Sequence, residues 1–165
     1  YRSLMRDVRG PLAGYVASTH WPRDRGSRAS RSGVEAQSGT GDLIQMLDLL
    51  RGTNDGWYDE VHSLRNSVGA DFVSLMTAGG STTYCGYAYI MSNVNQNFAS
   101  NAFSVLKYNC VANDTFTHEL GHNMGCDHER GVNATGFQAY SYSHGYRTPG
   151  DAYRTIMAYP PGTGI

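Results

Sequence analysis

The sequence lacks a long hydrophobic run, and no stretch of apolar residues approaches the roughly 20 that a membrane-spanning helix needs. It also lacks the pattern of a signal peptide, so any targeting segment was removed or never included. Charged residues make up only 16% of the chain, and we find neither an internal repeat nor a nucleic-acid-binding motif. These absences lead us to expect a globular protein that binds neither membranes nor nucleic acid.

Cysteine and lysine are also scarce. The three cysteines, Cys85, Cys110 and Cys126, are too few and odd in number for a complete disulfide framework, so one bridge and one free thiol is the simplest arrangement. A single lysine beside twelve tyrosines and twenty glycines is compatible with an exported protein. The length of 165 residues suits one domain that buries its own core, and we expect a monomer.

Charge is distributed unevenly along the chain. Residues 1–31 hold seven arginines against two aspartates, whereas the remainder holds six basic and twelve acidic residues. A basic arm can bind an anionic surface, but this one has no interleaved aromatic residues, which favours a solvated, poorly ordered segment. We therefore divide the chain into an Arg/Ser-rich segment at 1–41 and a folded domain at 42–165.

The hydrophobic periodicity from residue 42 onward predicts alternating helices and strands. Asp42 can cap a first helix that ends at Gly52, and Asp55 can start a second that ends at Gly69. This order predicts an α/β (α+β) fold with a mixed, twisted sheet. The expected elements are a short strand at 12–18, helices at 42–52 and 55–69, strands at 71–76, 84–92 and 103–106, and a helix that begins near Asp114 or Thr115.

The last of these helices carries the motif 115-TFTHELGHNMGCDHER-130. His118 and His122 are four residues apart and therefore project from one face of a helix, as two ligands of one metal must. Three apolar residues with the same spacing, Phe116, Leu120 and Met124, fall on roughly the opposite face, and we expect that face to turn toward the core. The alternative is an ordinary amphipathic helix with two surface histidines.

The residues after the helix favour the metal site. Gly125 tolerates positive φ, so it can end the helix and bring His128 back toward the other two histidines. Three imidazoles and one water form a tetrahedral zinc site with an open catalytic position. Glu119 lies to the side of His118, where it can take a proton from that water. The other three histidines have no partner at ligand spacing, and we expect them to fill surface or capping roles.

At these residues the sequence resembles the metzincin clan of zinc proteases, whose signature combines H-E-x-x-H-x-x-G-x-x-H with a later methionine turn. Its 118-HELGHNMG-125 run is similar to the reprolysin (adamalysin) branch, and residues 50–76 are most similar to bacterial peptidyl-Asp metalloendopeptidases. The signature residues here are His118, Glu119, His122, Gly125, His128 and, in 154-RTIMAY-159, Met157.

The resemblance covers about residues 42–160 and departs from the clan in four places, one of which is Cys126 at a variable position of the motif. Residue 129 is Glu, as in astacins, where adamalysins usually carry Asp. Residues 1–41 do not match the expected first strand and long helix, and the chain ends eight residues after Met157, where the clan has a further helix. We therefore expect a metzincin catalytic domain that is incomplete at both ends.

The resemblance also implies how substrate binds. The strand before the motif helix is the sheet edge that captures an extended peptide, which here means Gly86, Tyr87 and Ala88. Cys85 opens that strand and Cys110 follows the next one, so we expect these two to form the disulfide and Cys126 to stay free. In astacins and serralysins, a tyrosine two residues after the turn methionine donates to the oxyanion, which implies the same role for Tyr159.

Arg147 and Arg154 flank the segment that forms the pocket wall in metzincins. Either of them could pair with an acidic side chain of the substrate, although plain surface roles remain open for both.

The sequence as a whole predicts a secreted, extracellular zinc-dependent endopeptidase with one catalytic zinc ion. The catalytic residues would be Glu119 and Tyr159, and the metal ligands His118, His122 and His128. An accessory calcium ion stays an open question. The alternative is a degenerate protease fold that binds zinc or protein without catalysis; the intact Glu119 argues against it, because a binding module needs no base beside the metal.

Overall fold

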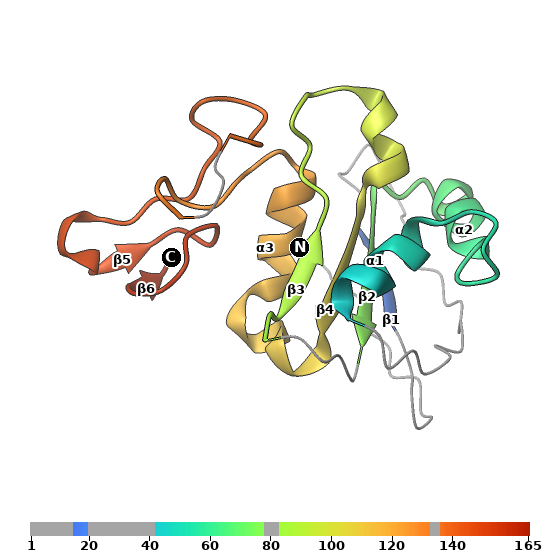
Figure 1. Ribbon diagram of the computed structural model, residues 1–165, viewed down its shortest axis with the longest axis horizontal. Coiled ribbons are helices and arrows are strands. Elements are labelled where there is room, and N and C mark those ends of the chain that lie inside the picture. Colours follow the sequence, from blue (N-terminus) through green and yellow to red (C-terminus); the bar gives the residue numbers. More distant parts are fainter. Residues whose placement is uncertain (1–14, 20–41, 78–82, 133–135) are drawn as a thin grey trace.

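The structure, a computed structural model, describes residues 15–19, 42–77, 83–132 and 136–165. A four-stranded sheet forms its centre, with helices packed on both faces (Figure 1). The strands of this sheet and the three α-helices are β1 (Tyr15–Thr19), α1 (Leu43–Arg51), α2 (Glu60–Val68), β2 (Phe72–Thr77), β3 (Gly86–Ala88), β4 (Phe103–Lys107) and α3 (Thr115–Asn123). The predicted α+β class with a mixed sheet is confirmed.

The strand order in the sheet is β1-β2-β4-β3. β2 and β4 run parallel, with Val73 opposite Phe103, while β1 and β3 run antiparallel to their neighbours. Among the described strands, β3 pairs with β4 alone, so β3 lies at an edge of the sheet. The expectations for residues 1–14 and 20–41 lie outside the described residues, and the boundary at residue 41 stays a prediction.

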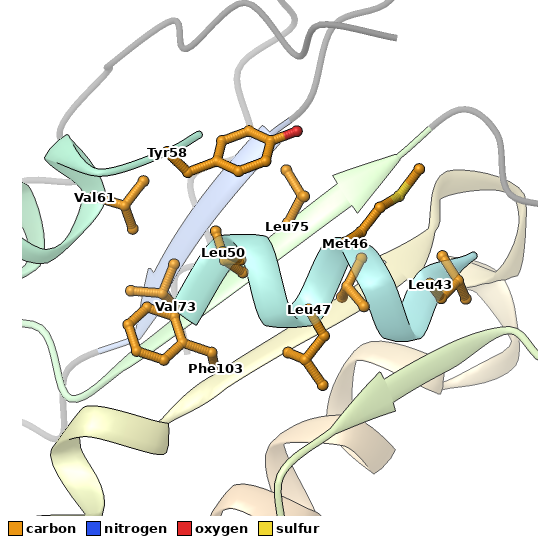
Figure 2. Close-up of a cluster of buried hydrophobic side chains, with 10 residues drawn as sticks. Leu43, Met46, Leu47, Leu50, Tyr58, Val61, Val73, Leu75 and Phe103 are labelled. Carbon is orange, nitrogen blue, oxygen red and sulfur yellow. The ribbon is translucent and has the colours of Figure 1, made fainter. Parts of the chain in front are cut away.

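One face of the sheet carries the main hydrophobic core. Side chains alternate along a strand, so every second residue of β2 and β4 points to this face and meets the apolar side of α1. The predicted cap of α1 is present: the Asp42 Oδ1 accepts from the Ile44 N–H at 3.4 Å. The buried cluster in Figure 2 comprises Leu43, Met46, Leu47, Leu50, Tyr58, Val61, Val73, Leu75, Phe103 and Val105.

The second helix begins later than predicted. It starts at Glu60 because the residues after Asp55 form a turn. The Asp59 carboxylate accepts hydrogen bonds from the backbone N–H groups of Asp55 and Gly56 at 3.2 and 3.1 Å. Such local bonds compete with helix formation, and Tyr58 has a φ of 54°, outside the helical range. The edge strand, predicted at 84–92, is also shorter, because only Gly86–Ala88 pair with β4.

Helix α3 covers the other face of the sheet. The apolar stripe of this helix is not its buried face. The predicted inward stripe is wrong: Met124 is 55% exposed, and Phe116 and Leu120 are only partly buried. Asn123 is fully buried instead, and its Nδ2 donates to the backbone oxygens of Tyr89 and Phe103 at 2.8 and 3.1 Å. The buried residues of α3 are Thr115, Glu119, His122 and Asn123.

The polar contact surface of the sheet explains this orientation. Ser74 and Ser104 are fully buried on the face away from the main core, and their hydroxyl oxygens lie 2.5 Å apart. Small polar residues let α3 approach closely, and its Asn123 binds two backbone carbonyl groups of the sheet side. The inward face of α3 is therefore defined by hydrogen bonding, which hydrophobic periodicity does not register.

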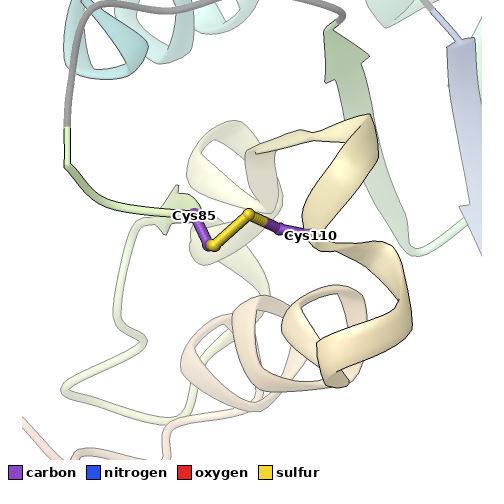
Figure 3. Close-up of a disulfide and its surroundings, with 2 residues drawn as sticks. All are labelled: Cys85 and Cys110. Carbon is purple, nitrogen blue, oxygen red and sulfur yellow. A yellow bond between two sulfur atoms is a disulfide. The ribbon is translucent and has the colours of Figure 1, made fainter.

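The disulfide between Cys85 and Cys110 joins the start of the edge strand to the turn that precedes α3 (Figure 3). Its two Cα atoms are 5.6 Å apart, and Cys126 is free, as expected. The remaining chain forms a loop-rich region with a small two-stranded sheet, β5 (Tyr153–Arg154) and β6 (Thr163–Gly164). In Figure 1 this region lies on one side of α3, and α1 and α2 lie on the other side.

Candidate metal centre and active site

Three histidines converge at the C-terminal end of α3. His118 and His122 come from successive turns of the helix, and His128 comes from the loop that follows. One ring nitrogen of each can be chosen so that all three lie within 4.8 Å of one another. The Nε2 atoms of His118 and His128 are 3.1 Å apart. Two imidazoles bound tetrahedrally to one zinc ion would place their nitrogens about 3.3 Å apart, so the spacing fits this metal.

The outer nitrogens of these rings are held by the protein. The Nδ1 of His118 lies 2.8 Å from the Ile156 carbonyl oxygen, and the Nδ1 of His122 lies 2.9 Å from that of Cys126. A carbonyl can only accept, so Nδ1 carries the proton in both rings and Nε2 keeps its lone pair for a metal. Burial lowers the pKa of all three imidazoles, that of His122 to about 4, which keeps them neutral.

The chain reversal that delivers His128 depends on Gly125. Its φ is +88°, and its N–H donates to the His122 carbonyl at 2.9 Å as the helix ends. A side chain there would also meet Ala139, whose Cβ lies 2.6 Å from the position of an added Cβ. After the reversal, the buried Asp127 carboxylate accepts from the His128 N–H at 2.8 Å. Gly125 therefore lies where the sequence placed it, and Asp127 holds the loop.

Met157 lies beneath the metal ligands, as the resemblance implied. It is buried, and its sulfur packs so closely against Gly121 that a Cβ on this residue would overlap it. Gly121 lies on α3 between the two helical histidines, and the Ile156 carbonyl that holds His118 directly precedes Met157. The methionine turn thus supports both the helix and one ligand ring.

Glu119 is 4% exposed and faces the edge strand. A Cβ added to Gly86 would lie 2.5 Å from Glu119 Oε1 and 2.8 Å from its Cδ. Only glycine at this position of β3 lets the carboxylate approach the strand backbone so closely. Burial raises the pKa of Glu119 to about 8 in the metal-free protein, and a bound cation would favour the charged form.

We predict that Gly86→Ala displaces the Glu119 carboxylate and lowers kcat by about 100-fold, the order of loss that a 1 Å misplacement of a reacting group causes. Metal content should not change, because the three atoms nearest to the added methyl group all belong to Glu119 and none to a histidine. Steady-state kinetics with metal analysis measures both effects. Gly164→Ala is the matched control, since that residue has no positive φ and a Cβ added there meets only the Arg154 guanidinium, at an ordinary contact distance of 3.8 Å. Parental activity in Gly86→Ala would contradict the prediction.

Tyr159 packs against the histidines from the methionine turn. Its ring centroid is 4.3 Å from that of His128 and 5.9 Å from that of His118. Burial, followed by the charge of Glu119, raises the pKa of Tyr159 to about 12, so its phenol stays protonated and can donate. Its backbone N–H donates to the buried Glu129 Oε2 at 2.9 Å. Tyr159 therefore lies beside two of the three clustered histidines.

The two arginines that the resemblance offered as substrate partners are already engaged within the chain. Arg147 lies 3.0 Å from Glu129 Oε1 and 3.6 Å from Asp151 Oδ1. Arg154 donates to two backbone carbonyls, at 2.8 Å through Nη1 and 3.1 Å through Nε. Both guanidinium groups stabilise the turn region around Met157. The ion pair between Arg147 and the buried Glu129 was not predicted from the sequence.

The predicted substrate strand, Gly86, Tyr87 and Ala88, lies at the edge of the sheet above the helix that carries Glu119. Tyr87 packs partly against the main core, and its ring meets that of Tyr84 edge to face at 5.3 Å. The structure therefore brings together the three histidines, places Gly86 against Glu119, and packs Tyr159 against His128. The supporting contacts of Asp127 with His128 and of Glu129 with Tyr159 were missed.

Comparisons with known proteins agree with this site. Residues 14–164 match the model of metallo-peptidase family M12. Two proteins named peptidyl-Asp metalloendopeptidase from Stenotrophomonas maltophilia strains are 35% and 34% identical over 74% and 81% of this chain. One from Pseudomonas aeruginosa is 32% identical over 64% of it. The aligned regions make up 28%, 32% and 20% of these relatives, so the chain spans less than a third of their length.

A solved structure described as "Structure of a chaperone-substrate complex" shares the fold, with a TM-score of 0.50 and 24% identity over 71% of this chain and 17% of that one. The family match includes all three histidines and Met157. It confirms the predicted kinship with metzincin zinc proteases and agrees with zinc as the cofactor that the donor set fits. The chain therefore belongs to metallo-peptidase family M12.

Proposed function

We propose that this chain is the catalytic domain of a zinc-dependent endopeptidase that acts outside the cell. The observation that carries the proposal is the convergence of three imidazole nitrogens with a buried carboxylate, Glu119, beside a sheet edge to which no further described strand is paired. A structural zinc site would be closed by a fourth protein ligand, and the only cluster of possible metal ligands among the described residues is the three histidines.

A zinc ion held by His118, His122 and His128 would supply a Lewis acid for the peptide carbonyl and lower the pKa of water at the site to roughly 7. Glu119 then takes the proton of the attacking water and later passes it to the leaving amine. The close approach of Gly86 fixes this carboxylate, and its burial excludes bulk water. The carbonyl contacts to His118 and His122 keep the ligand nitrogens free of protons.

The substrate would bind as an extended strand along β3. Backbone groups at the open edge of Gly86–Ala88 can pair with a peptide in the manner of β-addition. This pairing would place a peptide bond beside Glu119, because Gly86 lies against that carboxylate. The relatives carry the name peptidyl-Asp metalloendopeptidase, and we propose a preference for acidic residues here.

Tyr159 is the proposed donor to the oxyanion of the tetrahedral intermediate. Its ring lies against His128, and its phenol stays protonated because burial raises its pKa to about 12. We predict that Tyr159→Phe lowers kcat by about 100-fold or somewhat less, the effect of removing one oxyanion donor, with little change in KM. Tyr142→Phe, at a tyrosine that is 74% exposed, is the matched control. An unchanged kcat in Tyr159→Phe would leave the residue a packing role.

Digestion of denatured casein tests the proposed activity. The purified chain should release peptides, lose this activity with a chelator, and regain it when zinc is added back. Zinc binding without cleavage would support the second candidate, a degenerate fold that binds zinc or protein.

No helix in the described part of the chain has the length and apolarity to cross a membrane.

A further inference from the structure

A cavity of about 300 Å³ opens beside the metal ligands, and the mechanism above makes no use of it. One of its walls is His128, so anything bound in the cavity lies next to one of the three proposed metal ligands. The other walls come from the loop that follows the histidines. The lining residues are His128, Arg130, Gly136, Gln138, Ser141 and His144.

Arg130 is the cationic side chain of this cavity, and it is held at two points. Its Nε donates to His144 Nε2 at 2.9 Å, and its Nη2 donates to the Ser141 carbonyl at 2.7 Å. His144 is fixed in turn, because its Nδ1 lies 2.7 Å from the Gly145 carbonyl, which leaves Nε2 as the acceptor for Arg130. The guanidinium therefore has a set orientation before any ligand arrives.

Within the described residues, these partners use two of the five N–H bonds of the guanidinium, so three remain there for a ligand. No carboxylate among the described residues lies within ion-pair distance of Arg130, whereas Arg147 has two such partners and Arg51 has one. An arginine that is anchored, exposed and without an acidic partner matches the fork geometry that recognises carboxylates.

We propose that Arg130 binds the carboxylate side chain of an acidic residue in the peptide substrate and so determines where this enzyme cleaves. The inference rests on the proposed endopeptidase function and adds the residue that reads the substrate. In this proposal Arg130 takes the role that the sequence had suggested for Arg147 or Arg154, because the guanidinium groups of those two residues are already bound within the turn region.

The test compares two fluorogenic peptides that differ only in one residue beside the scissile bond, Asp in one and Asn in the other. Arg130→Gln should lower kcat/KM for the Asp peptide by about 10- to 100-fold, the range for a lost hydrogen bond to a charged group, and change it little for the Asn peptide. Arg130→Glu should in addition favour a third peptide with Lys in that position. Arg51→Gln, at an exposed arginine of α1, is the control.

The outcomes separate the two proposals. If the parent digests neither casein nor these peptides, the proposed function fails, and the inference fails with it. If the parent prefers Asp over Asn and Arg130→Gln keeps the same ratio, Arg130 is not the reader of the acidic residue and the proposed function stands. A purely structural role would lower both rates alike. If Arg130→Gln does not fold, Arg130→Lys replaces it: this variant keeps the charge but loses the fork, so the Asp/Asn ratio should fall yet stay above one.

Discussion

Replacing Glu119 by glutamine is expected to lower kcat by 10²- to 10⁴-fold while the protein keeps its zinc, because the amide preserves the shape of the side chain but cannot accept a proton. The isosteric change matters here, since the Glu119 side chain fills the space left by Gly86, and a truncation to alanine would also open a gap. Casein digestion measures the rate, and metal analysis after dialysis measures the zinc.

Glu60→Gln provides the control for this experiment, because Glu60 is an exposed glutamate in the first turn of α2. It should digest casein at the parental rate. If Glu119→Gln did so too, Glu119 would not be the base, and the proposed mechanism would be wrong. If instead Glu119→Gln lost zinc together with activity, the carboxylate would be a metal ligand.

The parts of the fold that could be predicted are those in which local chemistry and burial agree. Asp42 caps α1, and the apolar residues of that helix enter the core at the predicted spacing. The prediction failed for α3, where Asn123 is buried and Met124 is exposed. Periodicity measures hydrophobic burial only, whereas the inner face of α3 is selected by the backbone carbonyls of Tyr89 and Phe103.

The candidate site likewise contains residues that the sequence could predict and residues that it could not. The histidines and Glu119 follow from the spacing of one short motif, because a helix and a glycine reversal translate that spacing into geometry. The roles of Gly86 and Arg130 depend on which segments the fold brings together. Gly86 precedes Glu119 by more than thirty positions and touches it only across the sheet edge, so no local pattern could mark it. Arg130 was part of the quoted motif, but its partners, Ser141 and His144, lie in a later loop.

Replacing His128 by alanine is expected to remove tight zinc binding while leaving α3 in place. His128 follows the helix, which ends at Asn123, so its loss should not alter the helical hydrogen bonds. The two remaining imidazoles are too few for a stable site, since catalytic zinc is held by three protein ligands. Zinc content after dialysis should therefore fall from one equivalent toward zero, and casein digestion should fall with it.

Thermal unfolding gives a second readout of the same loss. Zinc that binds only the folded state stabilises it by RT ln(1 + [L]/Kd), so a chelator should lower the Tm of the parent protein. The Tm of His128→Ala should respond little to the chelator, because that variant carries no tightly bound metal. His62→Ala is the matched control: the Nε2 of His62 lies 3.0 Å from the Arg51 carbonyl in the helical layer, away from the three clustered histidines, so this variant should keep both its zinc and its response to the chelator. Full zinc retention in His128→Ala would remove this residue from the ligand set and require a different third donor.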